Sequence, residues 1–184
     1  MTTTATPTRP RRSERPSSPT SPRRLGRRTR RAVLVVHIAA AGAWIGIDVV
    51  LGVLVFTAML TSSAHTEALA YQALELFAVW PLLGAGFLTL ASGVALGLGT
   101  KFGLVRYWWV AVKLVLNVVL VSLVLLALRP AIADAAAYGE ALAAGAPADP
   151  STVSQLVFPP IVSTIALVFA TVLSVFKPWG RLRS

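Results

Sequence analysis

Residues 32–54 read AVLVVHIAAAGAWIGIDVVLGVL, a run that contains one histidine and one aspartate and is otherwise apolar or glycine. About 20 residues, at a rise of 1.5 Å each, cross the ~30 Å hydrocarbon core of a bilayer as a helix. The run continues to about residue 56, beyond the ~7–15 apolar residues of a secretory signal, so it predicts a retained membrane span. Three further apolar runs, at 77–98, 107–128 and 156–176, have similar lengths. The predicted fold is therefore all-α: a polytopic membrane protein with a four-transmembrane-helix bundle over residues 32–177.

The composition of the chain agrees with this class. Of its 184 residues, 55% are hydrophobic and only 13% are charged, and the mean hydropathy is +0.72. A soluble globular domain normally has about a quarter of its residues charged. The chain has no cysteine, which excludes disulfides, thiolate metal sites and cysteine nucleophiles. It also lacks the short motifs of metalloproteases, α/β-hydrolases and nucleotide-binding proteins, so we expect it not to be an enzyme of a familiar type.

The net charge of +10 is concentrated at the N-terminus. Residues 1–31 hold ten arginines and one acid, Glu14, among serines, threonines and prolines, a composition that predicts a disordered tail. Placing both termini in the cytoplasm, including the short basic tail 178–184, puts 15 of the 17 basic residues inside. We therefore expect a multi-pass protein of the plasma (inner) membrane. Its arginine-rich tail is expected to bind anionic lipids of the bilayer, and no nucleic acid is expected as a partner.

The segment 129–155 is predicted as the longest outer connector. Two interpretations stay open: a short surface helix over 131–144 that ends at Gly145, or an acidic connector without regular structure. Pro159 and Pro160 are predicted to lie in the first turn of the fourth span or to kink it. Tryptophans near the predicted span ends are expected to be interfacial anchors, namely Trp80, Trp108, Trp109 and Trp179.

Three ionisable residues lie inside the predicted spans: His37, Asp48 and Lys113. Such groups are costly in hydrocarbon and point to function. At 1.5 Å per residue, His37 and Lys113 lie roughly 8–9 Å from the inner ends of their spans, at nearly the same depth. Helical spacing places His37, Ala41, Trp44 and Asp48 on one stripe, and Arg106, Lys113, Asn117 and Leu120 on another. The two stripes predict a pocket toward the cytoplasmic side.

Three interpretations of this pocket stay open. His37 is a candidate axial ligand of a haem or porphyrin, with Lys113, Trp44 and Asn117 also binding it and Lys113 as the candidate catalytic residue. Alternatively, His37, Lys113 and Asp48 form the proton or ion relay of a small transporter. In the third interpretation the protein is a non-catalytic membrane subunit or scaffold, in which Lys113 reaches the inner interface and His37 bonds a neighbouring helix. Asp48 is expected to be structural and to pair with Arg129.

Small residues predict close packing between helices. Gly42 and Gly46 match the GxxxG pattern, as do Gly93 and Gly97, and small residues continue at positions 166, 170 and 174. Gly93 and Gly97 are therefore interpreted as structural. The pattern leaves open whether these contacts lie within one chain or in a homo-oligomer.

The segments HIAAAGAWIG, YQALELFAVWPLL and LGTKFGLVRYWWVAVKLVLN, between residues 37 and 128, resemble a family of small actinobacterial four-span membrane proteins of unknown function. More distantly, the H-I-x-x-x-x-A-W-x-G helix and the W-x-x-x-K-L helix are similar to copper-resistance D domains and to HemJ-type protoporphyrinogen oxidases. The second resemblance implies haem b as a cofactor, bound through His37 and Lys113, and an oxidoreductase acting on porphyrins. At residues 54–57 this chain reads LVFT, where the HemJ-type pattern has a further histidine.

Overall fold

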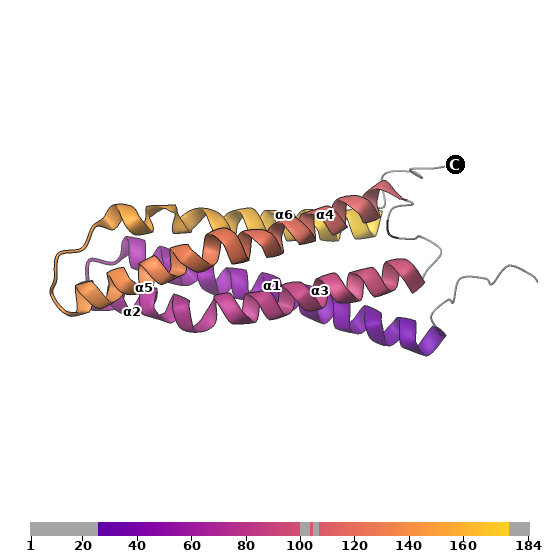
Figure 1. Cartoon of the computed structure of the whole chain (residues 1–184), viewed down its shortest axis with the longest axis horizontal. Helices are drawn as coiled ribbons and strands as arrows, with labels where there is room; N and C mark the ends of the chain where they lie inside the picture. The colour runs from indigo at the N-terminus through magenta and orange to yellow at the C-terminus, as the bar shows by residue number, and fades with distance from the viewer. Residues whose placement is uncertain (1–25, 100–103, 105–106, 177–184) are drawn as a thin grey trace, which may run out of the picture.

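The computed structural model describes residues 26–99, 104 and 107–176, and these residues form helices with no β-strand. The elements in chain order are α1 (Arg27–Leu60), α2 (Ala64–Phe77), α3 (Val79–Gly99), α4 (Trp108–Leu123), the π-helical turn η1 (Val124–Leu128), α5 (Arg129–Ala143), the 3₁₀ segment η2 (Pro150–Val157) and α6 (Phe158–Phe176). They form an elongated bundle of four rods: α1, α2 with α3, α4 with η1 and α5, and η2 with α6 (Figure 1). Each rod contains a helical stretch that is long and apolar enough to cross a membrane, which confirms the predicted all-α, four-span fold.

The rods are longer than a bilayer requires. Three of the four candidate spans contain 34, 36 and 36 residues, and the fourth contains 24. At about 1.5 Å per residue the first three extend ~50 Å, well beyond the ~30 Å hydrocarbon core. In the two rods of 36 residues the extra length comes from α2 and α5, which lie together at the end of the bundle opposite the C-terminus (Figure 1).

The N-terminal helix begins earlier than predicted. It starts at Arg27 instead of residue 32, so four arginines assigned to the tail lie on its first turns. Residues 1–25 of the predicted N-terminal tail and the predicted tail 178–184 lie outside the described residues.

The connector 129–155 is largely helical, as the first of its two interpretations predicted, but it is not a surface helix. Helix α5 continues directly from η1 and packs against α2. Gly139 faces α2 so closely that a Cβ there would lie 2.9 Å from the Ala68 carbonyl oxygen. The Tyr138 hydroxyl donates a hydrogen bond of 3.2 Å to Glu67, and its ring meets Tyr71 edge to face at 5.5 Å. This interhelix packing holds the alanine-rich segment against α2.

Local signals set the ends of several elements. The Ser63 hydroxyl accepts a hydrogen bond from the Thr66 backbone N–H and caps α2. After α5 ends, Gly145 has a φ of 67°, a left-handed conformation that favours glycine. Asp149 caps η2, because its carboxylate accepts a hydrogen bond from the Ser151 backbone N–H. This bond keeps the pKa of the Asp149 carboxyl below its ordinary value. Pro159 and Pro160 lie in the first turn of α6, as predicted.

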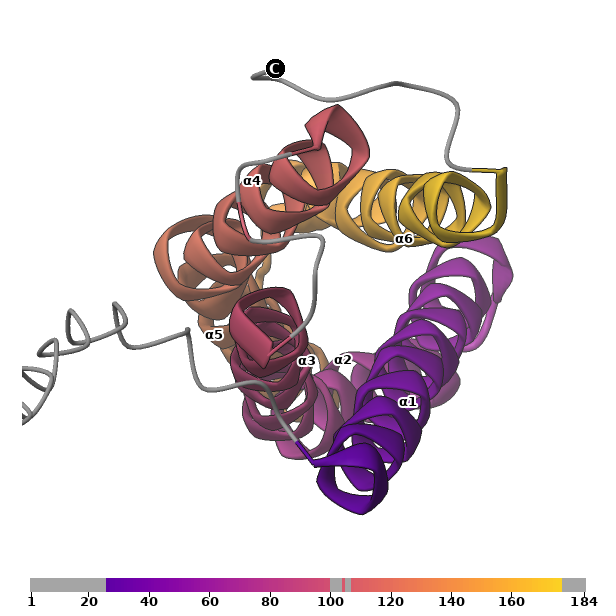
Figure 2. The same ribbon diagram turned by 90° about the vertical axis from the view of Figure 1, so that its right-hand side faces the viewer.

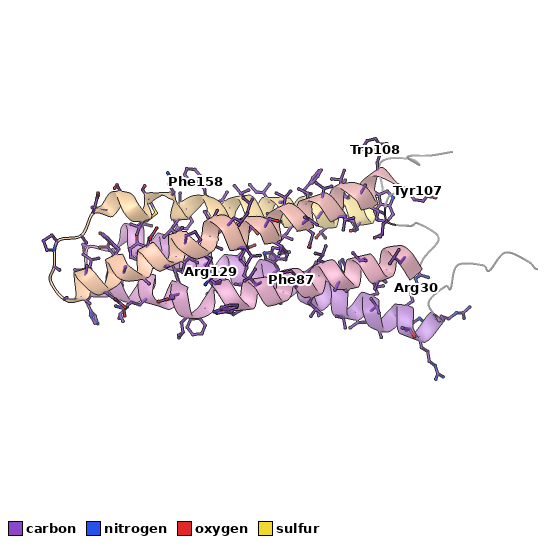
Figure 3. All side chains as sticks on the ribbon, viewed as in Figure 1. Arg30, Phe87, Tyr107, Trp108, Arg129 and Phe158 are labelled. Carbon is purple, nitrogen blue, oxygen red and sulfur yellow. The ribbon has the colours of Figure 1, made fainter. Side chains whose placement is uncertain are left out.

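The bundle has a buried core and an apolar exterior. Trp44, Tyr71 and Leu82 are among the largest fully buried side chains. Many large apolar side chains are exposed, among them Phe87 and Phe158, which are labelled in Figure 3. An apolar exterior of this kind suits contact with lipid tails instead of water.

The predicted tryptophan anchors divide into two kinds. Trp80 and Trp108 are 72% and 53% exposed, as an interfacial anchor requires. Trp109 is only 9% exposed, so its prediction as an anchor was wrong. Its indole packs inside the bundle near Lys113, and Trp179 lies outside the described residues.

Candidate intramembrane polar site

A cavity of about 120 Å³ lies between α1, α3, α4 and α6, and we call it the inner chamber. These four helices surround the bundle axis when it is viewed from the end that carries the first residues of α1 (Figure 2). The polar side chains that line the chamber are His37, Thr89, Lys113, Asn117, Thr171 and Ser174. Apolar residues of the same helices, and Leu104 between α3 and α4, complete its wall. His37 and Lys113 therefore line one cavity, as their equal predicted depth required.

Helix α3 fixes the orientation of the His37 ring. Its Nδ1 lies 3.1 Å from the Thr89 carbonyl oxygen and 2.9 Å from the Ser92 hydroxyl oxygen. A carbonyl oxygen can only accept, so the bond to Thr89 requires the proton to be on Nδ1. The Ser92 hydroxyl is free to accept from the same N–H because it donates to the Leu88 carbonyl oxygen at 2.6 Å. In neutral His37, Nε2 is consequently the basic nitrogen.

Lys113 is positioned by α4 and α6. Its ammonium group donates a hydrogen bond of 2.8 Å to the Ser174 hydroxyl. It also lies 4.8 Å from the centre of the Trp109 ring, within the range of a cation–π interaction. Ser174 in turn donates to the Ala170 carbonyl oxygen at 3.0 Å. These contacts hold the charged group at the chamber wall within the bundle.

Two buried oxygen atoms of chamber residues have no hydrogen-bond partner among the described residues. They are Oγ1 of Thr89 and Oδ1 of Asn117. Leaving such an atom unpaired costs about 1–3 kcal/mol, so sites of this kind in proteins usually contain ordered water or a ligand. One water needs roughly 10–15 Å³ of cavity, so about 120 Å³ accommodates several. The size and lining of the chamber therefore suit a small cluster of water.

Not every residue of the predicted pocket lines it. Trp44 is fully buried, but it packs beside Gly86, where a Cβ would lie 2.9 Å from its Cζ3 atom and 2.9 Å from the Val121 side chain. Its indole Nε1 has no partner in the described part of the chain. Trp44 shares a helical stripe with His37, but the crossing of α1 and α3 directs it into the core. Arg106, predicted on the stripe of Lys113, lies outside the described residues.

Asp48 lies elsewhere in the bundle and has a different partner from the expected one. It is only 2% exposed, and its Oδ2 accepts a hydrogen bond of 2.6 Å from the Ser163 hydroxyl of α6. The expected pairing with Arg129 is therefore replaced by a neutral donor.

The glycine patterns have unequal roles. Gly93 lies against His37, since a Cβ there would be 3.3 Å from the ring Cε1. A Cβ added at Gly97 would lie 2.6 Å from the Leu104 side chain, whereas one added at Gly42 or Gly46 would have no atom within 4 Å. The pattern of Gly93 and Gly97 thus marks close contacts. The pattern of Gly42 and Gly46 marks no close contact among the described residues.

Sequence reasoning missed the hydrogen-bonding residues that support the candidate site. Thr89 and Ser92 hold His37, Ser174 holds Lys113, and Ser163 holds Asp48. Hydroxyl side chains within otherwise apolar spans were the available signal, because they commonly bond across helices in membranes.

The chamber does not fit the haem that the distant resemblance implies. A histidine whose Nδ1–H is bound to a carbonyl and whose Nε2 is basic has the chemistry of an axial ligand. However, the chamber has a volume of about 120 Å³, and pockets for cofactors and drug-sized ligands are typically ~300–1,000 Å³. A porphyrin therefore requires the four helices to move apart.

Comparison of the chain with known protein families, with curated proteins and with solved structures finds no match.

Proposed function

We propose that this chain is a multi-pass plasma-membrane protein, not an enzyme, that works as a small proton transporter, with His37 as the proton-exchanging group. The observation that carries this proposal is the pair of unpartnered buried oxygens, on Thr89 and Asn117, in the chamber that His37 lines. Water bound to these oxygens would give the imidazole a proton donor and acceptor inside the membrane.

The proton step follows from the hydrogen bonds of His37. Neutral His37 accepts a proton on Nε2 and becomes imidazolium, while its Nδ1–H stays bound to the Thr89 carbonyl oxygen. Loss of the Nε2 proton to water restores the starting tautomer without rotation of the ring.

The test is proton flux through purified protein in liposomes that contain a pH-sensitive dye. A potassium diffusion potential drives the flux, and the wild-type chain should dissipate it faster than protein-free liposomes. The His37→Leu variant should fall to the protein-free rate. His65→Leu is the matched control, because it removes the chain's other histidine, which is exposed on α2. Equal rates for wild type and His37→Leu would refute the proposal.

We propose that both termini face the cytoplasm, with the arginines at the start of α1 near anionic headgroups. The distribution of basic residues supports this orientation. The chain has no cysteine, so single-cysteine variants report cleanly on topology. In intact cells, a membrane-impermeant maleimide should label Ala146→Cys at once and Thr29→Cys only after permeabilisation. The opposite pattern would invert the orientation.

Haem ligation, which the distant resemblance implies, needs the chamber to open beyond its volume of about 120 Å³, and an absorption spectrum tests it directly. Protein purified in detergent from haem-replete cells would then show a Soret band that His37→Ala removes and His65→Ala keeps. A spectrum without this band excludes haem. If the flux and the spectrum are both blank while His37→Leu assembles normally, the chain is a non-catalytic subunit.

A further inference from the structure

A second cavity of about 280 Å³, which we call the outer chamber, lies farther along the bundle toward α5 and η2. Its polar lining consists of Asp48, Gln155 and Ser163, and the remaining wall is apolar. The π-helical turn η1 contributes Val124 and Leu128 to this wall. Such turns inside helices often occur at functional sites, because the extra residue changes the direction of the side chains around it.

Asp48 is the one titratable side chain in the described lining of the outer chamber. Its neighbours there are Leu82 from α3, residues of α4 and η1, Ala131 from α5, Gln155 from η2 and Ser163 from α6. A carboxylate that is 2% exposed and whose partner in the described part of the chain is a hydroxyl group is costly as an isolated charge. The Asp48 carboxylate must therefore take up a proton, pair with a cation or be solvated by water in the chamber.

The two chambers share a wall. Leu120 of α4 lines both of them and is itself buried. Along α1, His37 and Asp48 are 11 residues apart, about 16 Å at 1.5 Å per residue. A polar site thus lies on each side of Leu120, in the same bundle and between the same helices α1, α4 and α6.

We propose that Asp48 is a second proton-exchanging group, in the outer chamber and in series with His37 across Leu120. This inference rests on the proposed function of the inner chamber. A proton from water on the outer side binds the Asp48 carboxylate and gives the neutral acid. Its loss to water regenerates the carboxylate, still held by Ser163.

The test is covalent labelling of the full-length wild-type protein with the hydrophobic reagent N,N′-dicyclohexylcarbodiimide at pH 7. The reagent adds to a protonated carboxyl: the acid proton moves to a carbodiimide nitrogen and the carboxyl oxygen bonds the central carbon, with no leaving group. Peptide mass spectrometry then gives the extent of labelling at each acid. Asp134 on α5 is the internal control, because it is exposed to water.

Labelling of Asp48 should exceed that of Asp134 by at least about tenfold, since a solvated aspartate is protonated only about 0.1% of the time at pH 7. Ser163→Ala should increase the rate at Asp48 severalfold, because the variant removes the hydroxyl donor that stabilises the carboxylate. Labelling of Asp48 no faster than Asp134 would overturn the inference. This readout needs no flux, so a failure here leaves the His37 proposal standing. A blank flux assay with strong Asp48 labelling refutes the His37 proposal and the series arrangement with it, and leaves Asp48 only as a protonated buried group.

Discussion

Replacing Gly86 by alanine should destabilise the bundle through a steric clash in its centre. An added Cβ would lie 2.9 Å from Cζ3 and 3.0 Å from Cη2 of Trp44, and 2.9 Å from Cγ2 of Val121. Carbon atoms prefer separations of about 3.5–4.0 Å, so the overlap is roughly 0.6–1 Å on two sides. Trp44 is fully buried, so its ring has no open space into which it can move.

The expected cost follows from overpacking of a filled core, which is typically about 1–3 kcal/mol. Alanine also raises helix propensity by up to about 1 kcal/mol relative to glycine, which opposes this cost. Gly84→Ala measures that second contribution alone, because it lies in the same helix and has no atom within 4 Å of an added Cβ. The difference between the two variants isolates the steric cost, and each 1.4 kcal/mol of it is a factor of about ten in the unfolding equilibrium.

The free energy of unfolding is measured in mixed micelles of a mild detergent and sodium dodecyl sulfate, by near-ultraviolet circular dichroism. Gly86→Ala should unfold at a clearly lower mole fraction of dodecyl sulfate than Gly84→Ala. Equal midpoints for the two variants would show that α3 does not approach Trp44 as closely as the structure places it. Such a result would refute the packing argument for the whole α1–α3 contact.

Three further predictions concern the end of the bundle formed by α2 and α5, and all are measured by the same unfolding assay. Gly139→Ala should cost about 1–3 kcal/mol, because the new Cβ meets the immovable Ala68 backbone oxygen at 2.9 Å; an unchanged midpoint would contradict that contact. Tyr138→Phe should cost about 0.5–1.5 kcal/mol by loss of the hydrogen bond to Glu67, and this cost should disappear when Glu67 is already alanine, which has no acceptor. Gly145→Ala should cost about 1–2 kcal/mol because its φ of 67° is strained for alanine; a neutral effect would mean that the turn relaxes.

The number of spans was predictable because span length is a local property. A run of about 20 apolar residues must bury its backbone hydrogen bonds in a helix wherever it enters lipid. The four runs therefore specified four helices without any knowledge of their neighbours. The two prolines at the start of α6 were predictable for the same reason, since their effect on the backbone is local.

The helical extension beyond the predicted spans was less predictable. The sequence of α5 is rich in alanine and carries charges, which is compatible with either a helix or an irregular connector. Close packing of Gly139 on α2 selects the helix, and this contact joins residues about 70 positions apart in the chain. A local pattern contains no information about such a partner.

In the candidate site, too, features of a single helix were predictable and contacts between helices were not. Helical spacing correctly brought His37, Lys113 and Asn117 to one cavity, because each stripe is a property of one helix. It wrongly included Trp44 and wrongly paired Asp48 with Arg129, since those contacts depend on how neighbouring helices are rotated and shifted.

The sequence by itself thus determined that the chain is an all-helical, four-span membrane protein and that its intramembrane polar groups are few. Only the tertiary structure decided which hydroxyl groups hold His37, Lys113 and Asp48, and that two chambers meet at Leu120. The physical reason is that a span is selected by the match of one helix to the bilayer. A cavity is instead the space left when four helices reach their closest packing together, which no single helix specifies.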